Sequence, residues 1–342
     1  MITRINDYNL RNANTFRVNA HCDEWIEYTS AADLPEIRAI IGTRPYMSIG
    51  EGSNMLFTTD FHGVILQSRI LDIEVESDHS GTILARVGAG VKVDDFIIQC
   101  AAQQIWGLEN LSGIPGMVGA SAVQNVGAYG VEAGDRIDKV EAFDMHTGEE
   151  VTFSTEECKF GYRDSIFKHQ PNRYVITYVT YRLSATPTPV LDYGNLRHAI
   201  DGIDSLTPLA VRKAVLVMRG AKLPDVDKVG SAGSFFKNPV VSEDTYKRVC
   251  SRAETSDVPY YKVGNQYKIP AAWLIEQSGM KGKTVRGAQV WERQPLVIVN
   301  SNSKATAEDI VELEQLIKDT VSQKFGINLI AEVDHIGSCS RE

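Results

Sequence analysis

The sequence lacks the cysteine and histidine patterns of disulfide-rich and metal-binding proteins. Its five cysteines lie far apart and include no C-x-x-C pair: Cys22, Cys100, Cys158, Cys250 and Cys339. An odd number of widely spaced cysteines is typical of free thiols in a reducing compartment. The seven histidines show no H-x-x-x-H or comparable spacing, so we expect no bound metal.

Signals for a membrane or a nucleic acid are missing as well. The longest apolar runs, such as PLVIV at 295–299, are only as long as a strand and cannot span a bilayer. The first residues, MITRINDYNL, contain no apolar segment of a secretory signal. The formal net charge of -9 argues against a broad phosphate-backbone binder, which needs a positive surface. We therefore expect a cytoplasmic, acidic monomer without a membrane or nucleic-acid partner.

The hydrophobic pattern predicts a mixture of helices and strands. Short β-rich runs separated by glycines precede residue 90, and similar runs recur at 140–183. A helix is predicted over 91–105, and another is predicted to begin at Pro208 with Thr207 as its N-cap. Beyond about residue 223, short amphipathic helices mix with strands, and two of these helices are predicted to end at Gly279 and Gly326. The strand-like tail is expected to return to an earlier lobe.

Two glycine-rich segments stand out against this pattern. In SIGEGSN (48–54), a strand ends in successive N–H groups suited to a pyrophosphate, although an ordinary turn is the simpler interpretation of this segment alone. It is not a Rossmann fingerprint, because Met55 occupies the third glycine position, and GAGVKV (88–93) fails in the same way. The run at 111–130 has glycines too frequent for a helix or a paired strand. Together the two segments could wrap an extended cofactor through backbone contacts.

These segments also carry a resemblance to a known family. GEGSN followed by SGIPGMVGASAVQNVGAYG resembles the FAD-binding lobe of vanillyl-alcohol-oxidase-type flavoproteins. More narrowly, the chain is similar to the UDP-N-acetylenolpyruvoylglucosamine reductase family, in the subtype with a tyrosine-bearing loop. GYRDSIFK (161–168), LDYGNL (191–196), AKLP (221–224), GSFFKNP (233–239) and AEVDHIG (331–337) fit that family in order.

The resemblance implies an α+β fold with a two-lobed FAD-binding region and a smaller α+β substrate-binding domain. We expect the first lobe at 1–70, joined by the tail at 327–342, the second at 71–222, and the substrate domain at 223–326. FAD is expected to be dissociable, although some relatives in the superfamily attach it through a histidine and His62 lies nearby. The residues implied in FAD binding are Gly50, Glu51, Gly52, Ser53, Asn54, Ser112, Gly113, Ile114, Pro115, Gly116, Gly119, Ala120, Asn125, Gly127, Ala128 and Tyr129.

The family chemistry implies three catalytic residues. NADPH reduces the flavin, which passes hydride to C3 of an enolpyruvyl ether, so charge develops at C2 and its carboxylate and needs fixed donors. Arg163 suits the carboxylate, although an ion pair with Asp164 or another carboxylate is the alternative. Ser234 is implied as the proton donor to C2, a weak acid that suffices because an enolate carbon is basic. Glu332 assists, with Asp334 as the less favoured candidate, because Ala331 and Asp334 depart from the family pattern.

The substrate is expected to be a nucleotide sugar. Lys222 and Asn238 are implied at its diphosphate and sugar, Tyr193 on a loop that covers it, and Tyr260 and Gln294 at the uridine or diphosphate. For Tyr260 a core aromatic is the alternative. Two other functions remain open at this stage, namely another FAD oxidoreductase of the superfamily and a nucleotide-sugar-binding regulator without catalysis.

Overall fold

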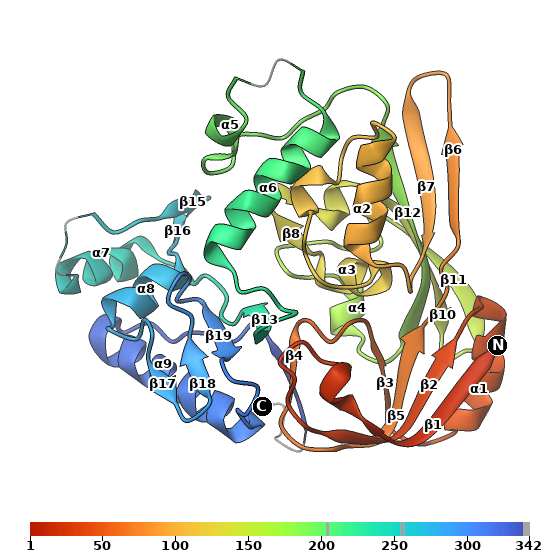
Figure 1. Cartoon of the computed structure of the whole chain (residues 1–342), viewed down its shortest axis with the longest axis horizontal. Coiled ribbons are helices and arrows are strands. Elements are labelled where there is room, and N and C mark those ends of the chain that lie inside the picture. Colours follow the sequence, from red (N-terminus) through yellow and green to blue (C-terminus); the bar gives the residue numbers. More distant parts are fainter. Residues whose placement is uncertain (203–204, 254, 256, 338–342) are drawn as a thin grey trace. The chain divides into compact units, whose positions relative to one another are not determined.

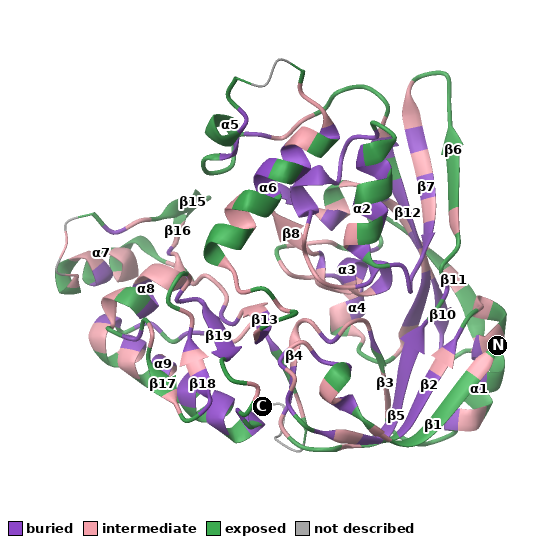
Figure 2. Ribbon diagram, viewed as in Figure 1, coloured by how far each residue is buried: buried purple, intermediate pink, exposed green. Residues whose placement is uncertain are grey.

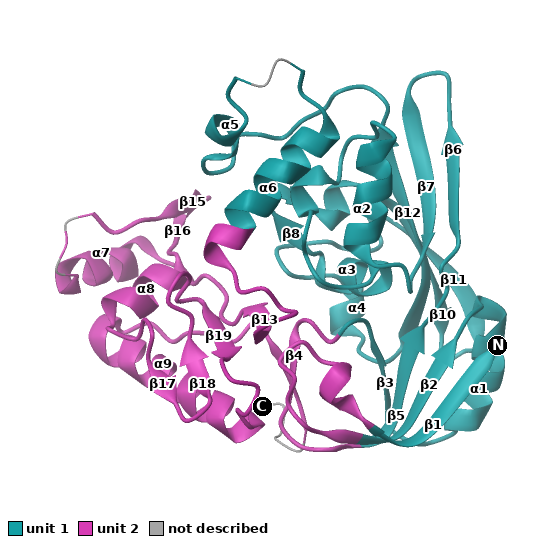
Figure 3. Cartoon of the chain, viewed as in Figure 1, with its two compact units in different colours: residues 1–8, 22–51, 62–219 teal, residues 9–21, 52–61, 220–342 magenta. Residues whose placement is uncertain are grey.

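The computed structural model describes residues 1–202, 205–253, 255 and 257–337, which form two compact units (Figure 3). Unit 1 comprises residues 1–8, 22–51 and 62–219, and unit 2 comprises residues 9–21, 52–61 and 220–342. Within the described ranges, no helix is long and apolar enough to cross a membrane. The lobe boundaries expected at 70, 222 and 326 stay a prediction.

A five-stranded antiparallel sheet forms the centre of unit 1 (Figure 1). Its strands occur in the order β11 (Glu149–Ser154), β10 (Ile137–Asp144), β12 (Tyr174–Ser184), β7 (Thr82–Gly88) and β6 (Ile73–Ser77). The 11-residue β12 pairs with β10 on one side and β7 on the other, and most of its residues are buried (Figure 2). The edge strand β6 is largely exposed, as expected for a strand with only one partner.

Helices α2 (Val93–Ala102) and α3 (Val118–Gln124) contribute to the core on this sheet. The helix predicted over 91–105 is confirmed as α2, and its apolar residues Val93, Phe96, Ile97 and Cys100 are all buried. Short α4 (Ile166–His169) follows β11 in the chain, and α5 (Leu196–Ala199) precedes α6 (Pro208–Lys222). The Thr207 hydroxyl accepts the N–H of Ala210 at 3.1 Å, which confirms the predicted cap of α6.

The prediction for the glycine-rich run 111–130 is wrong in part. Residues 118–124 form α3, and Gly127–Ala128 (β8) pairs with Val131–Glu132 (β9). The stretch VGASAVQ contains a single glycine, and its two alanines and its glutamine favour a helix. That glycine, Gly119, lies so close to Ala89 that a Cβ atom would be 2.9 Å from the alanine Cβ. The glycine therefore serves helix packing here and does not break the helix.

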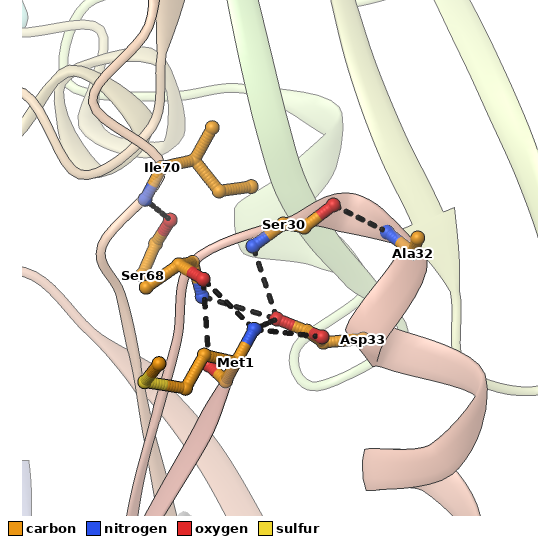
Figure 4. A network of polar contacts seen from close by, with 7 residues as sticks. Met1, Ser30, Ala32, Asp33, Ser68 and Ile70 are labelled. Atoms are coloured by element: carbon orange, nitrogen blue, oxygen red, sulfur yellow. Dashed lines mark hydrogen bonds and ion pairs between the residues drawn. The ribbon is translucent and has the colours of Figure 1, made fainter.

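A smaller sheet and one helix complete unit 1. Its order is β1 (Ile2–Asn9), β2 (His21–Tyr28), β5 (Phe61–Ser68) and β3 (Tyr46–Ile49), and α1 (Leu34–Ile41) packs in the same apolar cluster. The turn before α1 is fixed by Asp33, whose carboxylate accepts the Ser30 N–H and pairs with the Met1 ammonium at 2.8 Å (Figure 4).

Unit 2 contains an antiparallel sheet, a small three-stranded sheet and three helices. The first sheet has the order β13 (Gly230–Ser234), β19 (Val297–Asn300), β18 (Ala288–Val290) and β17 (Thr284–Val285). The second has the order β14 (Val240–Val241), β16 (Gln266–Lys268) and β15 (Tyr261–Val263). The helices are α7 (Glu243–Arg252), α8 (Ala271–Gln277) and α9 (Ala307–Phe325).

The predicted helix ends are confirmed in unit 2, while the return of the tail to the first lobe stays a prediction. Gly326 is the left-handed C-cap of α9 with φ 69°, and Gly279 follows α8 with φ 74°. The tail forms β20 (Asp334–Ile336), which pairs in parallel with β4 (Met55–Phe57). Of the cysteines, Cys22, Cys100, Cys158 and Cys250 are free thiols, and Cys339 lies outside the described residues.

Candidate active site

The loop after β3 exposes main-chain donors, as the sequence predicts. Within the described residues, the N–H groups of Glu51, Gly52 and Asn54 donate no hydrogen bond. Gly52 has φ 63°, and a Cβ atom there would lie 2.2 Å from the Ala13 carbonyl oxygen. Only glycine fits this backbone, because the left-handed conformation and the close approach both exclude a side chain. Neighbouring N–H groups such as those of Gly52 and Asn54, which lack a partner among the described residues, suit an anionic group of a ligand.

The two glycine-rich segments contact each other within unit 1. A Cβ atom at Gly50 would lie 3.0 Å from the Ala120 Cβ. The Glu51 carboxylate accepts the Gly116 N–H at 2.7 Å and pairs with Lys92 at 2.8 Å. The predicted cofactor residues of the two segments therefore contact each other directly, and their joint binding of a cofactor stays a prediction.

Most donors of the second segment are already used inside the protein. The Gly113 N–H goes to Asp94 at 2.5 Å, and the Gly119 N–H goes to the Ala89 carbonyl at 3.1 Å. The Ser112 hydroxyl donates to the Glu109 carbonyl at 2.6 Å. Asp94 is itself held by a bidentate pair with Arg212 of α6, at 2.5 and 2.8 Å. The N–H groups of Gly52 and Asn54 thus remain the better candidates for a pyrophosphate.

Arg219 is a candidate that the sequence analysis missed. It lies in the last turns of α6, and its Nε would lie 3.4 Å from a Cβ atom at Gly113. Burial lowers the pKa of its guanidinium, while Tyr129 and Asp94 nearby act in the opposite direction. The Arg219 guanidinium makes no hydrogen bond or ion pair with the rest of the described chain. This cation therefore suits an anionic ligand. Its place one turn before Lys222 is the only sequence signal that could have identified it.

Arg163 lies in a tight turn directed at the cofactor segment. Residues Gly161 and Asp164 exchange two main-chain hydrogen bonds at 3.0 and 3.1 Å, and Arg163 between them has φ 55°. Its guanidinium donates to the Gly127 carbonyl at 2.8 Å. The Asp164 carboxylate contacts His169 at 2.9 Å. The structure therefore brings the predicted Arg163 to the predicted cofactor residue Gly127.

Asn125 and Tyr129, near the end of the glycine-rich run at 111–130, make different side-chain contacts. Asn125 is buried and left-handed (φ 43°), and its side-chain amide contacts Glu132, Gly161 and Gly134 at 2.7 to 2.8 Å. Its predicted cofactor contact stays a prediction, while its side chain supports the turn that holds Arg163. The Tyr129 ring lies 6.1 Å from the ring of Tyr193, edge to face. Tyr193 is half-exposed, as a residue on a covering loop should be.

In unit 2, Ser234 and Glu332 lie on adjacent segments. Ser234 ends β13, after Gly233 with φ 73°, opposite Val297 of β19. The next residue, Phe235, accepts the Glu332 N–H at 2.8 Å through its carbonyl. The carbonyl of Glu332 in turn accepts the Asn54 amide at 3.1 Å. Three predicted site residues from distant parts of the sequence are thus held together.

The aromatic residues after Ser234 belong to the core of unit 2. Phe235 and Phe236 are fully buried, and their rings lie 5.1 Å apart. Phe235 also packs edge to face with Phe16 at 6.1 Å and with His335 at 6.0 Å. This packing fixes the main chain on which Ser234 sits.

The predicted substrate residues of unit 2 form two further sets of contacts. The Asn238 side-chain oxygen accepts the Ala271 N–H at the start of α8, at 2.9 Å. The Lys222 carbonyl accepts the Trp291 indole N–H at 2.9 Å, and the Gln294 N–H donates to the Trp291 carbonyl at 3.3 Å. Trp291 therefore links Lys222 and Gln294, although neither was predicted from a shared motif.

Tyr260 is an exposed member of an aromatic cluster. Its ring lies 5.0 Å from Tyr246 and 5.1 Å from Tyr267, and its relative exposure is 46%. The Lys262 ammonium lies 3.6 Å from the centroid of the Tyr267 ring, so Tyr260 is the more accessible aromatic of this cluster. No set of three or more histidine, cysteine or acidic residues suited to a metal exists among the described residues.

Comparisons with known proteins place these features in a family. Residues 26–154 match a family model described as an FAD binding domain. Residues 225–336 match the model of the UDP-N-acetylenolpyruvoylglucosamine reductase C-terminal domain. The fold and the two matches define a flavin-dependent oxidoreductase with a separate C-terminal domain.

Full-length relatives narrow this class. The chain is 43% identical over 96% of its length to the UDP-N-acetylenolpyruvoylglucosamine reductase of Bacteroides fragilis, of which it covers 99%. It is 42% identical to that of Porphyromonas gingivalis, over 96% of this chain and 98% of the relative. The chain therefore belongs to the UDP-N-acetylenolpyruvoylglucosamine reductase family. Its fold is similar to the crystal structure of the Thermus caldophilus reductase, with a TM-score of 0.67 at 24% identity over 98% of both chains.

Proposed function

We propose that this protein reduces UDP-N-acetyl-3-O-(1-carboxyvinyl)-glucosamine to UDP-N-acetylmuramate in peptidoglycan precursor synthesis, with NADPH as the electron source. The observation that carries the proposal is the similarity over nearly the whole chain to reductases of this name. The hydrogen bonding that places the segments of Ser234 and Glu332 side by side supports the assignment of the catalytic residues.

The residues present fit an FAD cofactor. Bound FAD would accept a hydride from NADPH and supply it to C3 of the enolpyruvyl ether. The N–H groups of Gly52 and Asn54, which donate no hydrogen bond among the described residues, suit its pyrophosphate, and the Arg219 cation suits a negative charge close to Gly113 and Tyr129. Gly50 packs closely on Ala120, so no side chain projects from position 50 toward the second segment.

Each catalytic side chain has a distinct task in this proposal. Arg163 binds the substrate carboxylate and stabilises the charge that develops on it, because guanidinium stays protonated and donates two parallel hydrogen bonds. Ser234 gives a proton to C2. Glu332 orients the substrate carboxylate and its partners. Lys222 and Asn238 hold the diphosphate and sugar, Tyr193 covers the substrate, and Tyr260 and Gln294 contact the uridine or diphosphate.

A spectroscopic experiment tests the activity. The purified protein should be yellow, NADPH should bleach it, and anaerobic addition of the enolpyruvyl nucleotide should restore the oxidised spectrum. A protein that stays colourless after incubation with FAD would refute the proposal. A protein that NADPH bleaches but the enolpyruvyl nucleotide cannot reoxidise would act on another substrate.

The role of Ser234 is tested by separating the two half-reactions. In Ser234→Ala, flavin reduction by NADPH should change little, while reoxidation by substrate should slow at least 10²- to 10⁴-fold, about the contribution of a general acid. Ser234→Cys should retain more activity than the alanine variant. Equal losses in both half-reactions would assign Ser234 to binding.

A further inference from the structure

One buried side chain connects the cofactor segment to the loop that bears Tyr193. Asn110 is 1% exposed, and its Nδ2 donates to the Tyr129 carbonyl at 2.7 Å and to the Val190 carbonyl at 2.8 Å. One amide group thereby joins two segments that lie about sixty residues apart in the sequence. Both contacts lie within unit 1.

The hydrogen bonds lie beside a second, apolar contact between the same segments. A Cβ atom at Gly130 would be 3.2 Å from the Tyr193 Cβ and 3.4 Å from a Val190 methyl carbon. Gly130 has φ 84°, so this close approach depends on glycine. Together with the edge-to-face rings of Tyr129 and Tyr193, the contacts form one continuous junction.

The choice of asparagine at this place has a structural cost. Its Oδ1 is buried and has no hydrogen-bond partner in the described part of the chain. The amide cannot be turned over, because Oδ1 would then face two carbonyl oxygens. An unsatisfied buried acceptor costs stability, whereas the two hydrogen bonds from Nδ2 satisfy the Tyr129 and Val190 carbonyls, which an apolar side chain would leave without this donor. The two donors of Asn110 therefore indicate a role in holding the junction.

We propose that Asn110 is a positioning residue that fastens the 190–193 segment to the cofactor segment and so sets how Tyr193 covers the substrate. This inference rests on the proposed roles of Tyr129 and Tyr193. Because Tyr193 is half-exposed, burial of its own ring does not fix its direction, and the junction with Tyr129 and Gly130 does. Binding of a cofactor at Tyr129 would then order the substrate loop through Asn110.

The kinetic test uses Asn110→Leu, which keeps the number and branching of the side-chain heavy atoms and removes both donors. The KM for the enolpyruvyl nucleotide should rise about 10-fold, while the rate of flavin reduction by NADPH stays within about 2-fold. In a Tyr193→Ala background, Asn110→Leu should add less than about 2-fold to KM, because the two act through one junction. Thr155→Val is the control, since the single hydroxyl hydrogen of Thr155 also faces two main-chain carbonyls, whose oxygens lie 2.7 and 3.0 Å from Oγ1, elsewhere in unit 1.

A second readout does not depend on turnover. In hydrogen–deuterium exchange, adding FAD to the FAD-free protein should slow exchange of residues 190–200 and of residues 50–54. In Asn110→Leu only the protection of 50–54 should remain. Unchanged protection of 190–200 in the variant, or independent effects of the two substitutions on KM, would overturn the inference. If Tyr193→Ala alone leaves KM unchanged, the proposed role of Tyr193 fails, and the exchange experiment still decides whether Asn110 couples the segments.

Discussion

The cofactor segments (50–54 and 112–130) and the catalytic segment of unit 2 (234–238 with 330–334) are built on different principles. In the first region, the predicted cofactor contacts come from the main chain, and glycines at Gly50 and Gly119 let segments approach each other closely. In the second, paired strands over a buried aromatic pair present side chains such as Ser234. Substitutions in the first region should therefore affect folding and FAD binding, whereas those in the second should affect rate.

The largest effect is expected from Gly52→Ala. Gly52 and Gly264 both have left-handed φ values, 63° and 56°, so an alanine at either costs about 1–2 kcal/mol of backbone strain. At Gly52 the new Cβ would also lie 2.2 Å from the Ala13 carbonyl oxygen, while nothing lies within 4 Å of a Cβ at Gly264. We expect Gly52→Ala to lose FAD and much of its stability in thermal unfolding.

Gly264→Ala is the matched control for that comparison. It should lose only the strain energy and keep its flavin. Similar melting temperatures and similar flavin content in the two variants would show that the close approach at Gly52 does not matter, and that the cofactor loop tolerates a side chain.

Arg219→Met should have the next largest effect. If the Arg219 cation binds a negative charge of the cofactor, its loss should weaken FAD binding about 10- to 100-fold, which corresponds to about 1.5–3 kcal/mol for a charge-assisted hydrogen bond. The substitution also removes a partly buried cation whose pKa burial lowers, so the apoprotein should be as stable as the parent or more stable. Fluorescence titration of the FAD-free protein measures the affinity.

Lys213→Met provides the control on the exposed face of the same helix. Its FAD affinity should stay within about 2-fold of the parent at moderate ionic strength. Equal weakening by both substitutions would mean that only the overall charge of α6 matters.

The sequence was sufficient where the information is local. Helix α6 begins where Thr207 and Pro208 predict, and α9 ends at Gly326, because caps depend on residues a few positions apart. Helix α3 was missed because the glycine content of the whole 111–130 run hid one helix-forming stretch. Within that stretch Gly119 packs against Ala89, and this contact explains the glycine. Ala89 lies thirty positions earlier in the sequence.

Two residues of the candidate site were not predicted from the sequence, for the same reason. Asn110 and Arg219 belong to no recognisable motif, and their importance comes from contacts with Tyr129, Val190 and Gly113. Family resemblance supplied Ser234 and Glu332 individually, whereas the hydrogen bond between the Glu332 N–H and the Phe235 carbonyl could be seen only in the fold. Long-range pairing of this kind leaves no periodic signal in a single sequence.

The smallest effect is expected from the ion pair between His335 and Glu314, next to the catalytic segment. His335 Nε2 lies 2.7 Å from buried Glu314, whose other oxygen pairs with Lys318 at 2.6 Å, and His335 Nδ1 lies 3.2 Å from the Val333 carbonyl. The hydrogen bond to Glu314 raises the pKa of His335 above its ordinary 6.5. Burial favours the neutral form of Glu314, but His335 and Lys318 outweigh it and lower its pKa below 4.5.

These directions fix the pH dependence. A histidine whose pKa is raised by folding contributes stability fully below its unfolded pKa, and this contribution is lost as the pH rises through the folded value. The glutamate contribution is present above its unfolded pKa and is lost as the pH falls through the lower folded value. The ion pair should therefore stabilise the protein most between about pH 4.5 and 6.5, and less at higher pH.

His335→Phe tests this contribution by urea unfolding at several pH values. The variant should be about 1–3 kcal/mol less stable than the parent near pH 6, and the difference should shrink toward pH 9. Replacing both partners, as in His335→Phe with Glu314→Leu, should recover part of the loss, because a well-packed apolar pair can replace a buried ion pair. A stability difference that stays constant with pH would mean that His335 supports Phe235 and the strand of Ser234 by packing alone. The ion pair with Glu314 would then contribute nothing to the stability of this region.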